Sequence, residues 1–291
     1  MYSFMKSRAY VLGVYIKQIY RWKKISDPYL SVDAFADLAD VCIFPPKYRK
    51  RTPSVRAIVN AKVIFCPSDR LDEFLQKFHG LIQPKVIIAG NSDFEFKSLP
   101  SNLPASVRML LLQNSFISDN HKVFTLPIGV ENLRLGVNGH PNLFRFTKIP
   151  PAARGRVLFG PFSATHPIRV GIKERFLNIP DTWKYMHSRI SPRRYRKIIE
   201  EGFEFVACPR GNGVDTHRLW ETIYRGRKAI IFQDDWSRSI PYLEPLVCTL
   251  SEWTLDEVIK ASQKDLTDFD PSSIPELWMP FWRELISRYL D

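Results

Sequence analysis

The chain has 291 residues, 45% of them hydrophobic, and its 42 basic side chains against 30 acidic ones give a net charge of +12. Its length suits one large domain or two of ordinary size, and the apolar content is sufficient for hydrophobic cores. No run of about 18 apolar residues is present, which excludes a membrane-spanning helix. The positive charge favours an anionic partner, such as a nucleotide diphosphate, a lipid phosphate, a nucleic acid or an acidic membrane face.

Residues 1–25 mix basic and aromatic side chains, and on a helix Val11, Tyr15 and Ile19 would follow one apolar stripe. Two interpretations stay open: an interfacial helix lying on anionic lipid, or an ordinary helix packed on the domain. The segment lacks the uninterrupted apolar stretch of a signal peptide. We therefore expect a cytoplasmic protein, in peripheral contact with the inner face of the membrane under the first interpretation.

The next segments predict a parallel α/β domain. A basic loop at 47–51 precedes four short apolar runs, which predict strands at 63–66, 86–89, 109–112 and 123–126. Each predicted strand runs into a polar loop at its carboxyl end, as in a parallel sheet that presents a cleft. The four cysteines (Cys42, Cys66, Cys208 and Cys248) flank apolar runs without a C-x-x-C pair, which predicts buried free thiols and no zinc site.

A second α/β pattern follows a linker near Pro150 and Pro151. It predicts strands at 156–159, 203–207, 229–232 and 247–250, and helices at 167–177, 191–201, 255–264 and 274–290. Ser191 and Thr254 are predicted to cap two of these helices, and Pro280 to break or kink the last one. The predicted domains are therefore residues 1–148 and 149–291.

Residues 203–232, FEFVACPRGNGVDTHRLWETIYRGRKAIIF, predict a strand, a Gly-rich turn, a helix that runs to about Arg225 and stops at Gly226, and a further strand. One side of this helix carries apolar side chains that are predicted to be buried: Leu219, Trp220, Ile223 and Tyr224. Glycines in the turn let backbone N–H groups approach an anion closely. Arg210 and Arg218 supply cations for phosphate, and Glu221 supplies a carboxylate for sugar hydroxyls. The segment thus predicts a nucleotide-sugar site, and a capped helix with a solvated charged face is the alternative.

Within this segment, CPRGNGVDTHRLWETIYRG resembles the C-terminal motif of exostosin-like glycosyltransferases, mostly bacterial polysaccharide or lipopolysaccharide enzymes. A looser likeness extends to KVFTLPIGVEN at 122–132 and IIAGNSDFEF at 87–96. The resemblance implies the GT-B fold, in which two Rossmann-like domains face a cleft and the second binds the nucleotide-sugar. It also implies that the closing helix, within 273–291, returns to the first domain.

The resemblance assigns roles to individual residues. Those expected to contact the donor are Arg169, Arg210, Gly211, Asn212, Gly213, Asp215, Thr216, His217, Arg218 and Glu221. The expected catalytic residues are Asp93, Arg210 and Glu221. Asp93 lies in a strand-end loop on the acceptor side, where an inverting transferase needs a base, although a turn-capping role is the alternative. Asp234, after strand 229–232, is a further candidate for touching the base or the sugar.

The resemblance implies sugar transfer from a nucleotide-sugar to a glycan or lipid-linked acceptor. No D-x-D stands at a predicted strand end, so we expect neither a metal nor any other cofactor. A basic nucleic-acid-binding protein is the first alternative, but no helix-turn-helix, zinc-finger or RNA-binding signature supports specific binding. The second alternative is an inactive transferase-like partner in a polysaccharide assembly.

Overall fold

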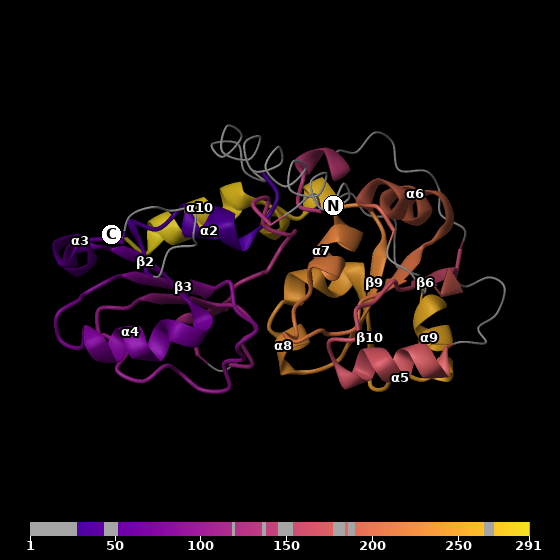
Figure 1. The fold of residues 1–291 in the computed structure, drawn as a ribbon, viewed down its shortest axis with the longest axis horizontal. Coiled ribbons are helices and arrows are strands. Elements are labelled where there is room, and N and C mark those ends of the chain that lie inside the picture. The colour runs from indigo at the N-terminus through magenta and orange to yellow at the C-terminus, as the bar shows by residue number, and fades with distance from the viewer. Residues whose placement is uncertain are drawn as a thin grey trace, which may run out of the picture.

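A computed structural model describes residues 28–43, 52–117, 120–135, 138–144, 154–176, 184–185, 190–264 and 271–290. The protein is α/β, and it contains two parallel sheets of five strands each (Figure 1). The predicted features at 1–25 and 47–51, the linker at Pro150 and Pro151, and the boundary between 148 and 149 lie outside the described residues.

The first sheet holds its strands in chain order. They are β1 (Val41–Cys42), β2 (Val63–Pro67), β3 (Val86–Gly90), β4 (Met109–Leu112) and β5 (Val123–Thr125). Side chains alternate between the two faces, and both faces are buried, which explains the continuous apolar runs in the sequence. Around this sheet lie α2 (Val32–Ala36), α3 (Val55–Asn60), η2 (Ser68–Arg70) and α4 (Leu71–Lys77).

The second sheet has the order β10-β9-β8-β6-β7. Its strands are β6 (Val157–Phe159), β7 (Lys184–Tyr185), β8 (Phe205–Ala207), β9 (Lys228–Phe232) and β10 (Val247–Leu250). The order reverses between β6 and β8, and ligands of open parallel sheets bind at the carboxyl ends of strands that flank such a reversal. The first sheet has no such reversal, so this argument selects the second sheet alone.

Helices of the second half confirm several local predictions. They are α5 (Pro167–Arg175), α6 (Pro192–Gly202), α7 (His217–Ile223), α8 (Asp235–Arg238) and α9 (Leu255–Ser262), with η4 at Pro241–Leu246. The Ser191 and Thr254 side chains cap α6 and α9 as predicted. After α7, Gly226 has a φ of 63°, and its N–H donates to the Ile223 carbonyl, which closes the helix.

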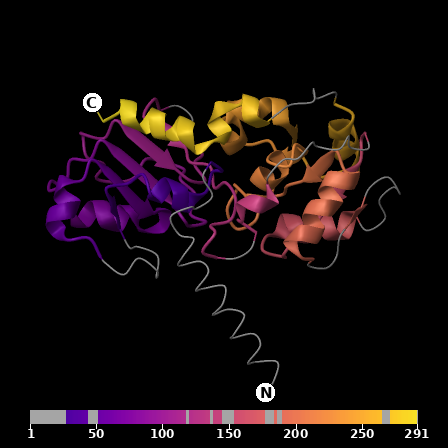
Figure 2. The same cartoon turned by 90° about the horizontal axis from the view of Figure 1, so that it is seen from above.

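The C-terminal segment returns to the first half (Figure 2). It contains η5 (Pro271–Ser273), η6 (Pro275–Leu277) and α10 (Met279–Arg288). Trp282 packs edge-on against Phe35 at 5.5 Å, and Tyr289 against Phe124 at 5.9 Å between ring centroids. Pro280 neither breaks nor kinks this helix, because it lies in the first turn, where its missing N–H has no intrahelical acceptor.

An aromatic cluster joins the two halves into one continuous core. The Tyr29 ring lies 5.1 Å from that of Tyr224 and 5.5 Å from that of Trp278. The Tyr224 hydroxyl donates to the Leu277 carbonyl at 2.6 Å and accepts from the Leu30 N–H at 3.1 Å. Residues from both sheets therefore bury apolar surface together.

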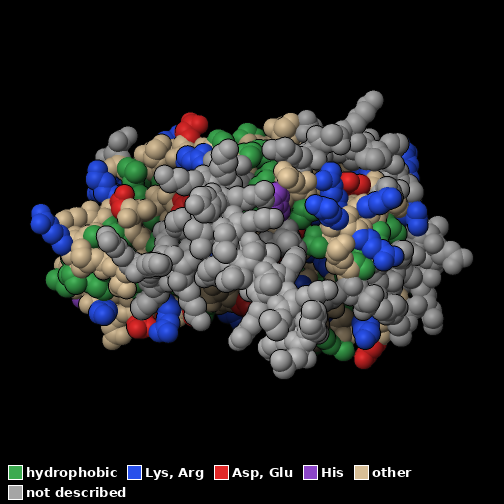
Figure 3. All heavy atoms as spheres, turned by 45° about the horizontal axis from the view of Figure 1, so that its top comes forward, with side chains coloured by type: hydrophobic (Ala, Val, Ile, Leu, Met, Phe, Trp, Pro, Cys, Tyr) green, Lys and Arg blue, Asp and Glu red, His purple; other side chains and the backbone are tan. Residues whose placement is uncertain are grey.

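Two surface properties bear on location. Among the described residues, no helix combines the length and apolar character that crossing a bilayer requires. Lys and Arg side chains gather at the end of the molecule formed by the second half (Figure 3), where α6 exposes Arg193, Arg194 and Lys197.

The four cysteines are buried and free, as predicted.

Candidate functional site

The carboxyl ends of the two sheets meet at one interface. Glu95, after β3, forms an ion pair with Arg210, after β8. The Thr125 hydroxyl at the end of β5 lies 2.6 Å from the Ser239 hydroxyl, and the Asn114 side chain after β4 accepts from the Asp215 N–H at 3.0 Å. Polar loops from both sheets thus share the region that the strand-end argument selects.

Arg210 bridges the two halves at this interface. One of its guanidinium nitrogens, Nη2, donates to Glu95 Oε1 and, at 3.0 Å, to the Asn212 carbonyl. The exposed fractions of the two side chains are 22% for Arg210 and 21% for Glu95, so the pair is largely shielded from solvent. Nη1 has no hydrogen-bond acceptor among the described residues. The cation is therefore fixed in place with donors left for an anion.

The glycines of the turn make room for protein side chains rather than for a ligand. A Cβ added to Gly213 would lie 2.8 Å from the Asn114 amide nitrogen, and one on Gly211 would lie 3.0 Å from the Arg169 guanidinium. Both glycines are buried, whereas Asn212 between them is exposed. We expected these glycines to let backbone N–H groups approach a ligand. In the structure, the side chains that lie close to them are those of Asn114 and Arg169.

Substituting Gly213 by Ala is expected to destabilise the fold by about 1–3 kcal/mol through overpacking. Asn114 is fully buried and hydrogen-bonded to the Asp215 N–H and the Ser92 carbonyl, so it has little room to move. Urea denaturation measures the loss. Gly171→Ala is the matched control, because its Cβ meets nothing within 4 Å and Ala favours the helix α5. Equal stabilities of the two variants would contradict this account of the turn.

Two further arginines tie together the loops at the strand-order reversal. Arg169 donates to the Arg210 carbonyl at 2.9 Å and to the Pro209 carbonyl at 3.2 Å. Arg218 donates to the carbonyls of Gly160, at 3.1 Å, and Pro161, and its guanidinium carbon lies 4.8 Å from the centre of the Phe162 ring. Burial and the Arg218 charge lower the pKa of Arg169 to about 10, so Arg169 stays cationic at neutral pH. They shape the site and contribute positive charge to it.

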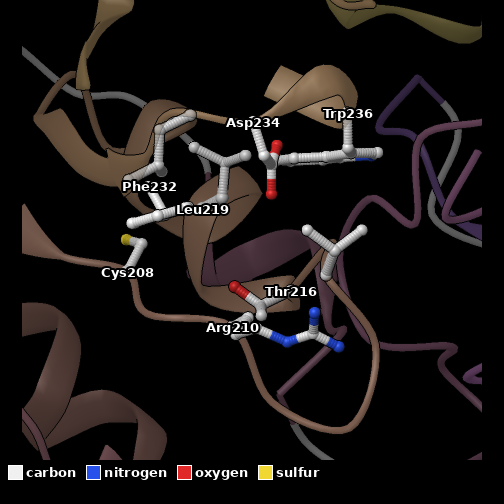
Figure 4. Close-up of a pocket in the computed structure, with 9 residues that line it drawn as sticks. Cys208, Arg210, Thr216, Leu219, Phe232, Asp234 and Trp236 are labelled. Atoms are coloured by element: carbon white, nitrogen blue, oxygen red, sulfur yellow. The ribbon is translucent and has the colours of Figure 1, made fainter. Parts of the chain in front are cut away.

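A small pocket opens between the ends of β8 and β9, and the empty space in and in front of it, open solvent included, is about 310 Å³. In Figure 4 the Trp236 indole and the Asp234 carboxylate lie across from Thr216 and Arg210. Its remaining lining residues are apolar or weakly polar: Cys208, Val214, Leu219, Ile231 and Phe232. Planar aromatic surface, a cation and a carboxylate thus converge on one small cavity.

Asp234 and Trp236 supply the polar groups in the part of the pocket wall that follows β9. Asp234 Oδ1 accepts from the Ser237 N–H at 2.8 Å and so caps α8. Burial raises the pKa of Asp234, while the nearby Arg210 charge lowers it. The indole N–H of Trp236 has no hydrogen-bond partner among the described residues.

A second polar group lies on another face of α7. His217 Nδ1 lies 2.8 Å from the Gly129 carbonyl oxygen, and Glu221 lies 3.8 Å from Arg225, with 14% of its side chain exposed. Burial raises the pKa of Glu221, which Arg225 and Arg218 oppose. Asp93 is exposed and lies near enough to His217 for its charge to favour the imidazolium. Leu219 and Trp220 face the core, as the helical spacing predicted.

The structure thus divides the predicted site residues. Arg210 and Thr216 line the pocket, and Arg169 and Arg218 hold the loops next to it. His217 and Glu221 lie toward the first half, whose loop after β3 carries Asp93. Thr216 precedes α7 but its side chain does not cap the helix. Sequence reasoning included Trp236 in the loop after strand 229–232 but did not single out Asn114 and Gly129. Asn114 stands two residues after β4, and its place in QNS was the available signal.

Asp215 does not face a ligand, contrary to our expectation. It is 3% exposed, and its two carboxylate oxygens accept from the Ile128 N–H at 2.7 Å and the Trp220 indole N–H at 2.8 Å. Burial raises the pKa of Asp215 to about 7, although the N–H donors favour the ionised form. The residue holds α7 and the first half together instead of binding the donor.

Comparisons with known proteins leave the family open. No protein-family model matches the chain, and a search of curated proteins found no match. In the part of the chain that the structure describes, no group of three or more His, Cys, Asp or Glu side chains has an arrangement suited to a metal ion.

Proposed function

We propose that the protein is a metal-independent glycosyltransferase of the exostosin-like, GT-B type. It transfers a sugar from a nucleotide-sugar donor to a hydroxyl of a glycan or lipid-linked acceptor, in bacterial surface polysaccharide synthesis. The observation that carries this proposal is the pocket that Arg210, Thr216, Asp234 and Trp236 line, at the carboxyl ends of β8 and β9. It opens where the strand ends of the two sheets meet.

The chemistry of the pocket fits a nucleotide-sugar. Arg210 has guanidinium donors left for a phosphate oxygen, and a carboxylate such as Asp234 accepts from sugar hydroxyls. The Trp236 indole, 2% exposed, forms part of the apolar wall of the pocket. The pocket is small, so in this proposal it holds one part of the donor and the remainder extends along the interface.

The arginines replace a metal in this proposal. As the bond between the sugar and the diphosphate breaks, negative charge develops on the leaving phosphate oxygens. Fixed cations in a partly buried site stabilise such charge without reorganisation. Arg210 contacts the phosphate, and Arg169 and Arg218 raise the local positive potential behind it. Glu221, on the other face of α7, is proposed to contact the sugar or the ribose from the interface side.

The location of the reaction follows from the acceptor. A lipid-linked acceptor would place the protein in the cytoplasm, on the inner face of the membrane, with the loop that carries Asp93 on the acceptor side. The basic residues on α6 give the second half a surface that attracts anionic headgroups.

A thermal-shift panel of nucleoside mono- and diphosphates tests the proposed function. One diphosphate is expected to stabilise the protein selectively, by about 2.7 kcal/mol at a concentration 100 times its Kd. Asp234→Asn is expected to weaken the response to the matching nucleotide-sugar more than that to the free diphosphate. Equal stabilisation by every polyanion, lost as salt rises, would indicate non-specific charge and contradict the proposal.

A further inference from the structure

The imidazole of His217 is held in one tautomer. Its Nδ1 lies 2.8 Å from the Gly129 carbonyl oxygen, and a carbonyl oxygen only accepts hydrogen bonds. Nδ1 therefore carries the proton, and Nε2 presents a lone pair. Nε2 makes no hydrogen bond to any residue that the structure describes. A half-buried, oriented base with an unused lone pair is thus present at the interface.

The groups around His217 favour its role as a proton acceptor. Burial lowers the pKa of the imidazole, so its uncharged form, which can accept a proton, predominates at pH 7. The charges of Asp93, from the loop after β3, and Glu131, from the loop after β5, oppose this shift and favour the imidazolium. A proton that arrives on Nε2 therefore meets two carboxylates that stabilise the new charge.

Glu131 adds a second acceptor atom, in a carboxyl that also receives hydrogen bonds from Asn138. Its Oε2 is buried and has no hydrogen-bond partner among the described residues, and burial raises the pKa of this carboxyl. Glu131 interacts electrostatically with both His217 and Glu221. Buried polar atoms normally have partners, so adjacent acceptors without donors indicate a site for hydroxyl groups. A sugar supplies several hydroxyls from one molecule.

We propose that His217 is the catalytic base, and that it takes the proton of the acceptor hydroxyl while Glu131 accepts from a neighbouring hydroxyl. This rests on the proposed transferase function and replaces Asp93 as the base. The hydroxyl proton moves to Nε2, the hydroxyl oxygen forms the new bond to the anomeric carbon, and the bond from that carbon to the phosphate oxygen breaks. Its electron pair leaves with the nucleoside diphosphate.

The position of His217 suits this step. It directly follows Thr216, which lines the pocket, and its Nδ1 contact reaches a loop of the first half. The base is thus next in sequence to a residue of the donor pocket, and it contacts a loop assigned to the acceptor side. Asp93 is exposed, and its role becomes that of a charge that stabilises the imidazolium.

His217→Asn tests the proposal with little change in structure, because the Asn amide nitrogen replaces Nδ1 as donor to the Gly129 carbonyl while the base is lost. The assay is release of nucleoside diphosphate from a panel of nucleotide-sugars, with water as the acceptor, against pH. We expect the rate to fall by about 10²–10⁴-fold and the acidic limb of the profile to disappear. Affinity for the free diphosphate is expected to change by less than roughly twofold.

Asp93→Asn is the matched variant, expected to lower the rate less and to keep the acidic limb. If Asp93→Asn removed that limb and His217→Asn kept it, Asp93 would be the base and the proposal would be overturned. Retention of near-wild-type rates by His217→Asn would overturn it as well. A wild-type protein that binds no nucleoside diphosphate would overturn the proposed function and this inference together.

The tautomer provides a readout that does not need activity. Nitrogen NMR of the wild-type protein is expected to show His217 protonated at Nδ1 at neutral pH. Its pKa is expected below the ordinary imidazole value of 6.5. A tautomer protonated at Nε2 would leave no lone pair for the acceptor hydroxyl and would overturn the inference whatever the kinetics of the variants.

Discussion

Replacing Arg210 by Ala is expected to lower the rate of the proposed sugar transfer by about 10²–10³-fold, the loss expected when one fixed donor to a developing oxyanion is removed. The guanidinium lines the pocket and retains an unused donor nitrogen, so its removal leaves the leaving phosphate without its nearest cation. The free energy of unfolding is expected to fall by about 1 kcal/mol or less, since the Arg210 and Glu95 side chains keep 22% and 21% of their surface exposed and solvent still screens the pair. Steady-state kinetics and urea denaturation measure the two effects.

Glu95→Gln separates the two roles of Arg210. This variant removes the ion pair between the halves but keeps the cation in the pocket. Transfer is expected to stay within about tenfold of the wild-type rate, because the charge that faces the phosphate remains. If Glu95→Gln lost as much activity as Arg210→Ala, the contact between the halves would be what matters, and the assigned role of Arg210 would be incorrect.

Replacing Asp215 by Ala is expected to destabilise the protein by about 2–6 kcal/mol. Two buried donors, the Ile128 N–H and the Trp220 indole N–H, lose their acceptor, and each unsatisfied donor costs about 1–3 kcal/mol. Loss of the buried carboxylate offsets part of this cost. Urea denaturation gives the value. A change below about 1 kcal/mol would show that these hydrogen bonds do not hold the halves together.

The pH dependence of Asp215→Asn provides an independent check. The pKa of Asp215 rises from 3.8 to about 7 on folding, so its contribution to stability is complete below about pH 4 and is lost as pH rises through 7. An amide has no such dependence. The Asn variant is therefore expected to lose more stability relative to the wild type at pH 5 than at pH 8. Equal losses at both values would mean that the carboxyl is ionised throughout this range.

The amino-acid sequence by itself determined the local elements. Runs of consecutive apolar residues predicted the strands at 86–89, 109–112 and 247–250, because strands buried on both faces need them. Ser191, Thr254 and Gly226 predicted helix ends through hydrogen bonds that reach no farther than one turn. The missed strands at Val41–Cys42 and Lys184–Tyr185 are only two residues long, too short for such a pattern.

The site depended on contacts that only the tertiary structure decided. Gly213 meets Asn114, Asp215 accepts from the Ile128 N–H, and His217 contacts Gly129, each across about 85 to 100 residues of chain. Residue spacing reports neighbours within one helix or strand, so it could place these residues on α7 but could not say what they face. Those partners come from the packing of the two sheets end to end. For this reason Asp215, which we expected to contact a ligand, has a structural role.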